Sequence, residues 1–88
     1  MVLKVTEQFN RDISKLRDRK LIVAVKKALQ KIEAARALPE IAQVKKMEGS
    51  SRYFRLRIGD YRLGVFAEGN TVYAVRFLHR KDIYKYFP

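Results

Sequence analysis

Residues 52–62, with the sequence RYFRLRIGDYR, alternate between apolar and polar side chains, which is the period of a β-strand. Arg55 and Arg57 therefore point to one side, and the apolar residues around them point to the other. Gly59-Asp60 is a two-residue turn signal, after which the next strand begins. The pattern predicts a β-hairpin with one apolar face and one face of guanidinium groups. Planar, forked donors suit phosphates, so we expect this second face to bind an anion.

Two stretches nearer the amino terminus place apolar residues at helical spacing. Thr6 is the candidate N-cap of the first helix, and Asp18 is the candidate N-cap of the second. We expect the second helix to run to about Ala37, because Pro39 prevents its simple continuation. The two apolar stripes are Phe9, Ile13 and Leu16, and Ile22, Val25, Leu29 and Ile32.

Further strands complete the predicted order β-α-α-β-β-β-β. Residues 2–5 form a first strand, and residues 44–48 form a short, lysine-rich one. Gly69-Asn70 is a second two-residue turn, which joins strands at 61–67 and 71–78. We therefore predict a single domain of the α+β class spanning the whole chain. Its amino-terminal strand and helical hairpin would pack on one face of a mainly antiparallel four-stranded sheet.

Strand parity divides the sheet residues between a covered face and an open face. We expect the open face to be a shallow groove, because the small residues Gly64 and Ala74 lie among large arginines. The predicted covered residues are Phe54, Leu56, Ile58, Tyr61, Leu63, Val65, Tyr73, Val75 and Phe77. The predicted open residues are Arg55, Arg57, Arg62, Gly64, Ala74 and Arg76.

Charge is the strongest feature of the composition, at +11 from 20 basic and 9 acidic groups in 88 residues. This balance points to a polyanionic partner: nucleic acid, an acidic protein, or both. With no cysteine and one histidine, the chain predicts neither disulfides nor a metal site, and we expect no cofactor. Lys26 and Lys27 interrupt the apolar run at 21–25, so we expect no membrane segment and a cytoplasmic location.

Three segments carry recognisable motifs, namely KKMEG at 45–49, YFRLRIGDYRL at 53–63 and HRKDIY at 79–84. Together with the element order, they resemble the RelE/ParE toxin superfamily of bacterial type II toxin-antitoxin systems. The resemblance implies a RelE-like toxin that cleaves messenger RNA in the ribosomal A site and so inhibits translation. It also implies a cognate antitoxin as partner, which we expect to be acidic and to carry an amphipathic helix. Operator DNA would be contacted only through the antitoxin complex.

The resemblance also implies roles for individual residues. Two strand arginines match positions that contact RNA phosphates, and Arg62 matches a basic residue that stabilises the transition state. Arg80 and Tyr84 match an arginine just after the last strand and an active-site tyrosine, and His79 is similar to a catalytic histidine of sister branches. The predicted catalytic residues are Arg62, His79, Arg80 and Tyr84. The predicted phosphate-binding residues are Lys45, Lys46, Arg55, Arg57 and Arg76.

RNA cleavage by its own 2′-hydroxyl needs a base, an acid and cations that stabilise a dianionic phosphorane. Arginine serves the last need but stays protonated, so proton transfer must fall to other groups. His79 and Tyr84, whose ordinary pKa values are about 6.5 and 10, are the candidates. We predict that Arg62 and Arg80 stabilise the transition state while His79 and Tyr84 share the proton transfers. Tyr84 has the alternative of stacking on a base.

Blander interpretations stay open for the same residues. His79 fits a surface position, and the aromatic tail formed by Tyr84, Tyr86 and Phe87 fits simple packing on the sheet. The arginines fit ion pairs with Asp60, Glu48 or Glu68. At the level of function, the first alternative is the ParE branch, which inhibits DNA gyrase without cleaving RNA. The second is a plain RNA-binding module, which is disfavoured because Phe66 is the one aromatic residue expected on the open face.

Overall fold

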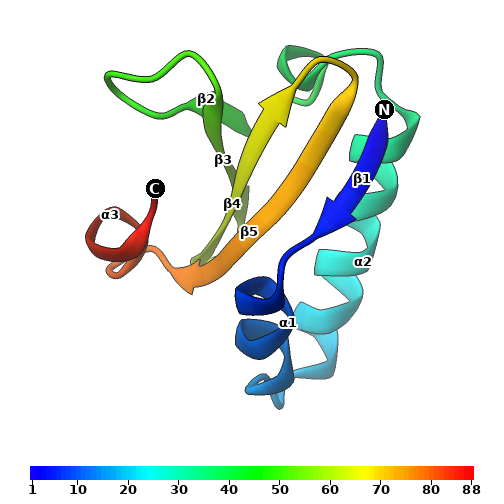
Figure 1. Cartoon of the computed structure of the whole chain (residues 1–88). Helices are drawn as coiled ribbons and strands as arrows, with labels where there is room; N and C mark the ends of the chain where they lie inside the picture. The colour runs from blue at the N-terminus through cyan, green and yellow to red at the C-terminus, as the bar shows by residue number, and fades with distance from the viewer.

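All five strands join one mixed sheet in the order β1-β5-β4-β3-β2, in a computed structural model that describes residues 1–88 (Figure 1). β1 pairs with β5 in parallel, and every other pair of neighbours is antiparallel. The elements in chain order are β1 (Val2–Val5), α1 (Glu7–Ser14), α2 (Arg19–Ala34), the 3₁₀ turn η1 (Leu38–Glu40), β2 (Val44–Lys46), β3 (Tyr53–Ile58), β4 (Tyr61–Glu68), β5 (Thr71–His79) and α3 (Ile83–Tyr86). The α+β class and the order of the five strands and two long helices are confirmed, but α3 was not predicted. The first strand is also part of the sheet, which has five strands rather than four.

Both long helices begin at the predicted caps. The Thr6 hydroxyl accepts a hydrogen bond from the Phe9 N–H at 3.1 Å, and the Asp18 carboxylate accepts from the Lys20 N–H at 3.0 Å. These contacts satisfy N–H groups that have no partner within the helix. None of the helices combines the length and apolar character needed to cross a membrane.

The second helix ends at Ala34, three residues earlier than predicted. Pro39 has no N–H, and in a continued helix its ring would clash with the carbonyl of Ala35, so the backbone is extended at Ala35 and Ala37 before η1 begins. The amino-terminal ammonium of Met1 donates to the carbonyls of Glu33 and Ala35 at 2.7 and 3.0 Å. A positive group there favours the helix dipole and ties β1 to the end of α2.

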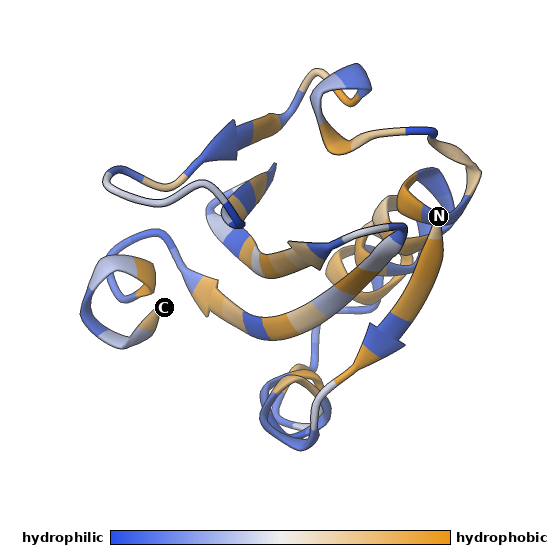
Figure 2. Cartoon of the chain, turned by 45° about the horizontal axis from the view of Figure 1, so that its top comes forward, coloured by the Kyte–Doolittle hydropathy of each residue, from blue (hydrophilic) through white to orange (hydrophobic).

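The main core lies between α2 and one face of the sheet, and Figure 2 shows hydrophobic stretches, in orange, along the strands and helices. Leu63, Val65 and Ile32 are fully buried within it, which joins the centre of β4 to α2. The hairpin turns at Gly59 and Gly69 have φ of 59° and 58°, as the two-residue turn signals require. The complete cluster is Phe9, Val25, Ala28, Ile32, Leu38, Ile41, Leu56, Ile58, Leu63, Val65, Val72, Ala74 and Phe77.

A β-bulge in β5 overturns part of the predicted face assignment. Gly64 pairs with Arg76, but its neighbour Val65 pairs with Ala74, so β5 carries one extra residue at this point. The extra residue reverses the parity of the preceding part of β5. Ala74, predicted to be open, is buried in the core, whereas Tyr73 and Val75, predicted to be covered, lie on the opposite face.

The carboxyl-terminal tail covers part of that opposite face. Ile83 and Phe87 are 0% and 3% exposed and pack with Met47 in a second, smaller cluster. A Cβ on Gly64 would lie 2.8 Å from the Phe87 ring, so this glycine makes room for the tail. The groove predicted at Gly64 is therefore filled by the chain's own tail, and the open surface lies to one side of it.

Candidate functional site

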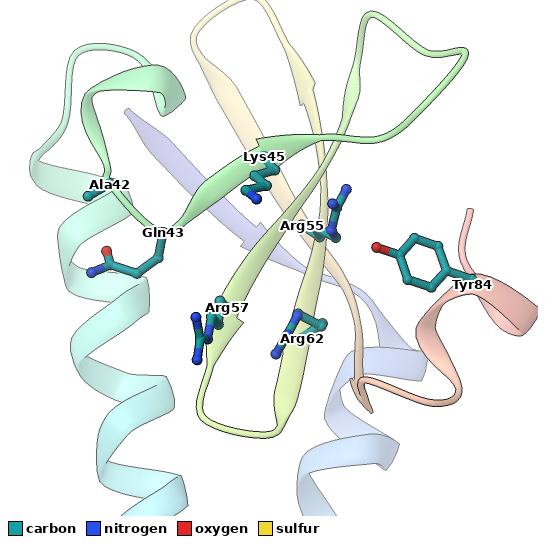
Figure 3. A pocket seen from close by; sticks show the side chains of 7 residues that line it. All are labelled: Ala42, Gln43, Lys45, Arg55, Arg57, Arg62 and Tyr84. Carbon is teal, nitrogen blue, oxygen red and sulfur yellow. The ribbon is translucent and has the colours of Figure 1, made fainter.

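A hollow of about 290 Å³ opens between the β3-β4 hairpin, the start of β2 and the tail (Figure 3). Figure 3 shows Arg55 extending towards Tyr84, with Arg57 and Arg62 near the turn of the hairpin. We call this site the arginine hollow. Its lining residues are Ala42, Gln43, Lys45, Arg55, Arg57, Arg62 and Tyr84.

Strand pairing concentrates positive charge in the arginine hollow. Lys45 lies directly opposite Arg55, and Arg57 lies directly opposite Arg62. Like charges at opposed positions of antiparallel strands destabilise a sheet. The alternation in β3 thus places basic groups on one face and keeps Leu56 and Ile58 in the core, as the sequence predicted.

The protein's own acids do not neutralise these cations. Its two ion pairs are Arg52 with Glu68 and Arg76 with Asp12, and neither includes a residue of the hollow. Arg62 donates instead to the carbonyls of Gly59 and Tyr61, at 3.0 and 2.9 Å. The alternative in which the hollow's arginines serve as ion-pair partners is therefore wrong.

Arg55 is fixed by neutral groups. It donates to the Lys46 carbonyl at 3.3 Å, and its Cζ lies 5.4 Å from the centroid of the Tyr84 ring, in a cation-π arrangement. These contacts hold the guanidinium at the wall of the hollow without cancelling its charge. An anion that enters therefore meets a preplaced cation.

Tyr84 reaches the arginine hollow because α3 is anchored by its neighbours. Ile83 and Phe87 are buried, while the side chain of Tyr84 remains exposed and lines the hollow. Simple packing thus explains Ile83 and Phe87 but does not account for the position of Tyr84. The tail turns one phenol towards the arginines, as the sequence predicted.

The structure corrects the predicted grouping of His79 with the arginines. His79 pairs with Tyr61 and packs edge-on against its ring at 5.5 Å, and Tyr61 stacks on the core residue Phe77. Arg62 pairs with Leu78, so His79 and Arg62 project from opposite faces of the sheet. The His79 Nδ1 accepts a hydrogen bond from the Lys81 N–H at 3.2 Å.

Arg80 and Lys46 also lie outside the arginine hollow. Arg80 follows β5, where its backbone N–H donates to the Asp60 carbonyl at 2.8 Å and its side chain is exposed. Lys46 is exposed in β2 at the position after Lys45, so strand parity turns it away. Gln43, which the sequence did not single out, lines the hollow because it directly precedes β2.

Arg76 is held by a buried carboxylate that the sequence prediction missed. Its Nε lies 2.8 Å from Asp12 Oδ2 and its Nη2 lies 3.2 Å from Oδ1. Asp12 also accepts the backbone N–H of Phe77 at 2.9 Å. The side-chain hydrogen bonds from Arg76 to Asp12 raise the pKa of Arg76 above its usual range. Arg76 thus fastens α1 to β5 and does not line the arginine hollow, which corrects its predicted place among the phosphate-binding residues.

Comparison with known proteins places the chain in a family. Over residues 3–84 the chain matches the family described as ParE toxin of type II toxin-antitoxin system, parDE. It is 49% identical over 45 residues to Toxin RelE3 of Methanocaldococcus jannaschii, and the match spans about half of each protein, 51%. A chain of the RelB-RelE antitoxin-toxin complex from Methanococcus jannaschii is 29% identical, with a TM-score of 0.80 and coverage of 97% of this chain and 99% of that one.

Two further solved structures share the architecture. A chain of the toxin-antitoxin complex RelBE2 from Mycobacterium tuberculosis is 26% identical, with a TM-score of 0.69 over 90% of this chain and 96% of that one. YoeB from Staphylococcus aureus, at 18% identity, shares the fold, with a TM-score of 0.72 and coverage of 90% and 95%. The chain belongs to the family of ParE toxins of type II toxin-antitoxin systems, within the RelE/ParE superfamily that its motifs resemble.

Proposed function

We propose that the protein is a RelE-like toxin that cleaves messenger RNA in the arginine hollow, on the ribosome. The observation that carries this proposal is a hollow whose four cations have no acidic partner in the chain and which also contains a tyrosine. Such a site is incomplete without an anion, and a phosphodiester supplies both the charge and a reacting atom.

The cleavage uses the RNA's own 2′-hydroxyl as nucleophile. The 2′-oxygen bonds to phosphorus as its proton passes to a base, and the bond to the 5′-oxygen breaks as that oxygen receives a proton. Arg57 and Arg62, on opposed strands, face the phosphate and stabilise the phosphorane charge, while Arg55 holds the RNA backbone. Tyr84 and Lys45 are the groups of the hollow that carry the two protons.

An antitoxin would act on the same surface. Several of the solved structures that the chain resembles are toxin-antitoxin complexes, which supports a cognate antitoxin as partner. An acidic segment laid in the arginine hollow would neutralise the unpaired cations and exclude RNA. We expect tight, salt-sensitive binding, and Arg57→Glu should weaken it more than Lys26→Glu, an equal change of charge outside the hollow.

The decisive experiment incubates the purified protein with programmed ribosomes and, separately, with naked RNA, and maps new 5′ ends by primer extension. Cleavage by the wild type that is lost in Arg62→Ala supports the proposal. Equal cleavage by Arg62→Ala would contradict the role of the hollow. If the wild type cleaves neither substrate but blocks DNA gyrase, the alternative of a gyrase inhibitor is correct.

A further inference from the structure

The arginine hollow is the first of three hollows that adjoin one another. The second lies between α2 and β3 and shares Gln43 and Arg57 with the arginine hollow. The third lies along the first half of α2 and shares Ala24 and Lys27 with the second. Figure 3 shows Arg57 and Gln43 on the side of the hairpin that faces α2. The shared residues make the three hollows one continuous surface, which we call the basic track.

The basic track has cations along its whole length. Lys27 and Lys31 line the second hollow, and Arg19 and Lys20 line the third, in addition to the four cations of the arginine hollow. No aspartate or glutamate lines any of the three. The adjacent acid, Asp18, is already engaged as the N-cap of α2. The positive surface thus extends well beyond the space that one phosphate fills.

We propose that the basic track binds the single-stranded RNA whose phosphate reacts in the arginine hollow, so that the strand beside this phosphate runs over Arg57 and along α2. This inference rests on the proposed function. Lys27 and Lys31 lie one helical turn apart, so both side chains reach the same groove. Tyr84, at the far end, is the only aromatic residue that lines the track. Along α2 the contacts are therefore with phosphates, and they position the strand without selecting a sequence.

RNA fits the track better than an acidic protein does. The track is continuous with the hollow where the phosphodiester reacts, and its second part has the small residues Ala24, Ala28 and Gly59 in its lining. Small residues let an extended backbone approach closely, and the lysines in the same lining can meet its phosphates. A protein segment of this length would have to be acidic at every turn to use the same cations.

The test uses the full-length protein and 2′-O-methyl oligoribonucleotides of increasing length, which cannot be cleaved, with binding followed by fluorescence anisotropy. The variant is Lys27→Gln/Lys31→Gln. The matched control is Lys15→Gln/Lys26→Gln, which has the same net charge and changes exposed residues that line none of the three hollows. Lys26 is next to Lys27 in sequence, but the helix turns it away by about 100°.

For the wild type and the control, we expect affinity to rise with oligonucleotide length until the track is filled. For Lys27→Gln/Lys31→Gln, the rise should stop at a shorter length. The slope of log Kd against log salt should fall by about 1.4, because each single-strand phosphate contact contributes about 0.7. The same length dependence and slope in variant and control would overturn the inference. The inference would also be overturned if Lys27→Gln/Lys31→Gln weakened binding only to ribosomes, or only to an acidic protein, and left binding to the free oligonucleotides unchanged.

The outcomes separate this inference from the proposed function. A wild type that binds RNA with this length dependence, but cleaves nothing, upholds the track and overturns the nuclease. A wild type that cleaves RNA, with a variant that binds like its control, upholds the nuclease and overturns the track. A wild type that binds no free oligonucleotide overturns the track, while the cleavage assay on ribosomes decides the nuclease separately.

Discussion

Three of the four cations in the arginine hollow are arginines, which cannot give up a proton. A substitution at Tyr84 can therefore affect proton transfer without affecting RNA binding. In Tyr84→Phe the ring keeps its place beside Arg55 and loses only the hydroxyl. We expect the single-turnover cleavage rate to fall by about 10²- to 10⁴-fold, with little change in RNA affinity. Tyr86→Phe is the matched control, since Tyr86 is on the same helix, is exposed to a similar degree and does not line the hollow. Equal rates in the two variants would exclude the phenol from proton transfer.

Arg76 has a structural task that the exposed Arg52 does not share. The side chain of its partner Asp12 is 7% exposed, whereas the partner of Arg52, Glu68, is 60% exposed. Arg76→Ala leaves a buried carboxylate without its cation, and we expect a loss of about 2–3 kcal/mol in the free energy of unfolding. Arg52→Ala should cost less than about 1 kcal/mol. Urea denaturation of the two variants measures both values, and equal losses would contradict this view of the Asp12 pair.

His79 shows how far residue-level inference reaches. Counting by two from Phe77, a core residue, already places His79 on the covered side, so strand parity could have separated it from Arg62. Asp12 left no such signal, because a polar residue in a short helix resembles a solvated one. Its burial depends on where β5 lies relative to α1, which only the assembled sheet decides.

At the level of elements, α3 works as an anchored arm that positions Tyr84, with Gly64 as its seat. A methyl group at Gly64 would meet the Phe87 ring at 2.8 Å. We therefore expect Gly64→Ala to destabilise the protein by about 1–3 kcal/mol and to slow cleavage by displacing the arm. Adding Phe87→Ala removes the clash, so the double variant should lose less stability than the sum of the two single changes. Thermal unfolding of the three variants measures this coupling, and strict additivity would argue against the contact.

The sequence predicted elements well where one side-chain period was clear. In β3 the alternation of arginine with apolar residues allows one register, so the sequence correctly placed Arg55 and Arg57 on the face opposite the core. In β5 the run from Val72 to Val75 is apolar on both faces, so no parity argument could locate the bulge. The contact between the tail and Gly64 could not be predicted. The tail is short and aromatic, and a glycine in a strand can serve several purposes other than making room for another segment.

At the level of the whole molecule, the basic track exists only because α2 lies beside β3. Basic residues are spread over both halves of the chain, and the lysines of α2 look like an ordinary wet helix face. The sheet brings Arg57 next to Lys27 and Lys31, residues well separated in sequence. Part of the net charge of +11 is thus concentrated on one surface of the folded protein, which composition alone does not reveal.

Unpaired cations that lie close together lower the stability of the folded protein but are needed to bind an anion. A substitution at Arg57 tests whether both effects occur. Arg57 faces Arg62 across the hairpin, and like charges at that spacing cost about 0.5 kcal/mol. We expect Arg57→Gln to raise the Tm of the free protein by about 2–4 °C, while Lys26→Gln, a change of the same charge outside the hollows, should have a smaller effect.

With uncleavable RNA bound, we expect the wild type to have a higher Tm than Arg57→Gln, the reverse of the order expected for the free proteins. At 100 times its Kd a ligand stabilises the folded state by about 2.7 kcal/mol, and Arg57→Gln, which binds more weakly, should gain less at the same RNA concentration. Thermal unfolding with and without the oligonucleotide measures both effects. A variant that is stabilised when free and equally stabilised by RNA would show that Arg57 costs stability without serving the ligand. The expected change in the order of the two Tm values would show that RNA binding relieves the repulsion between Arg57 and Arg62.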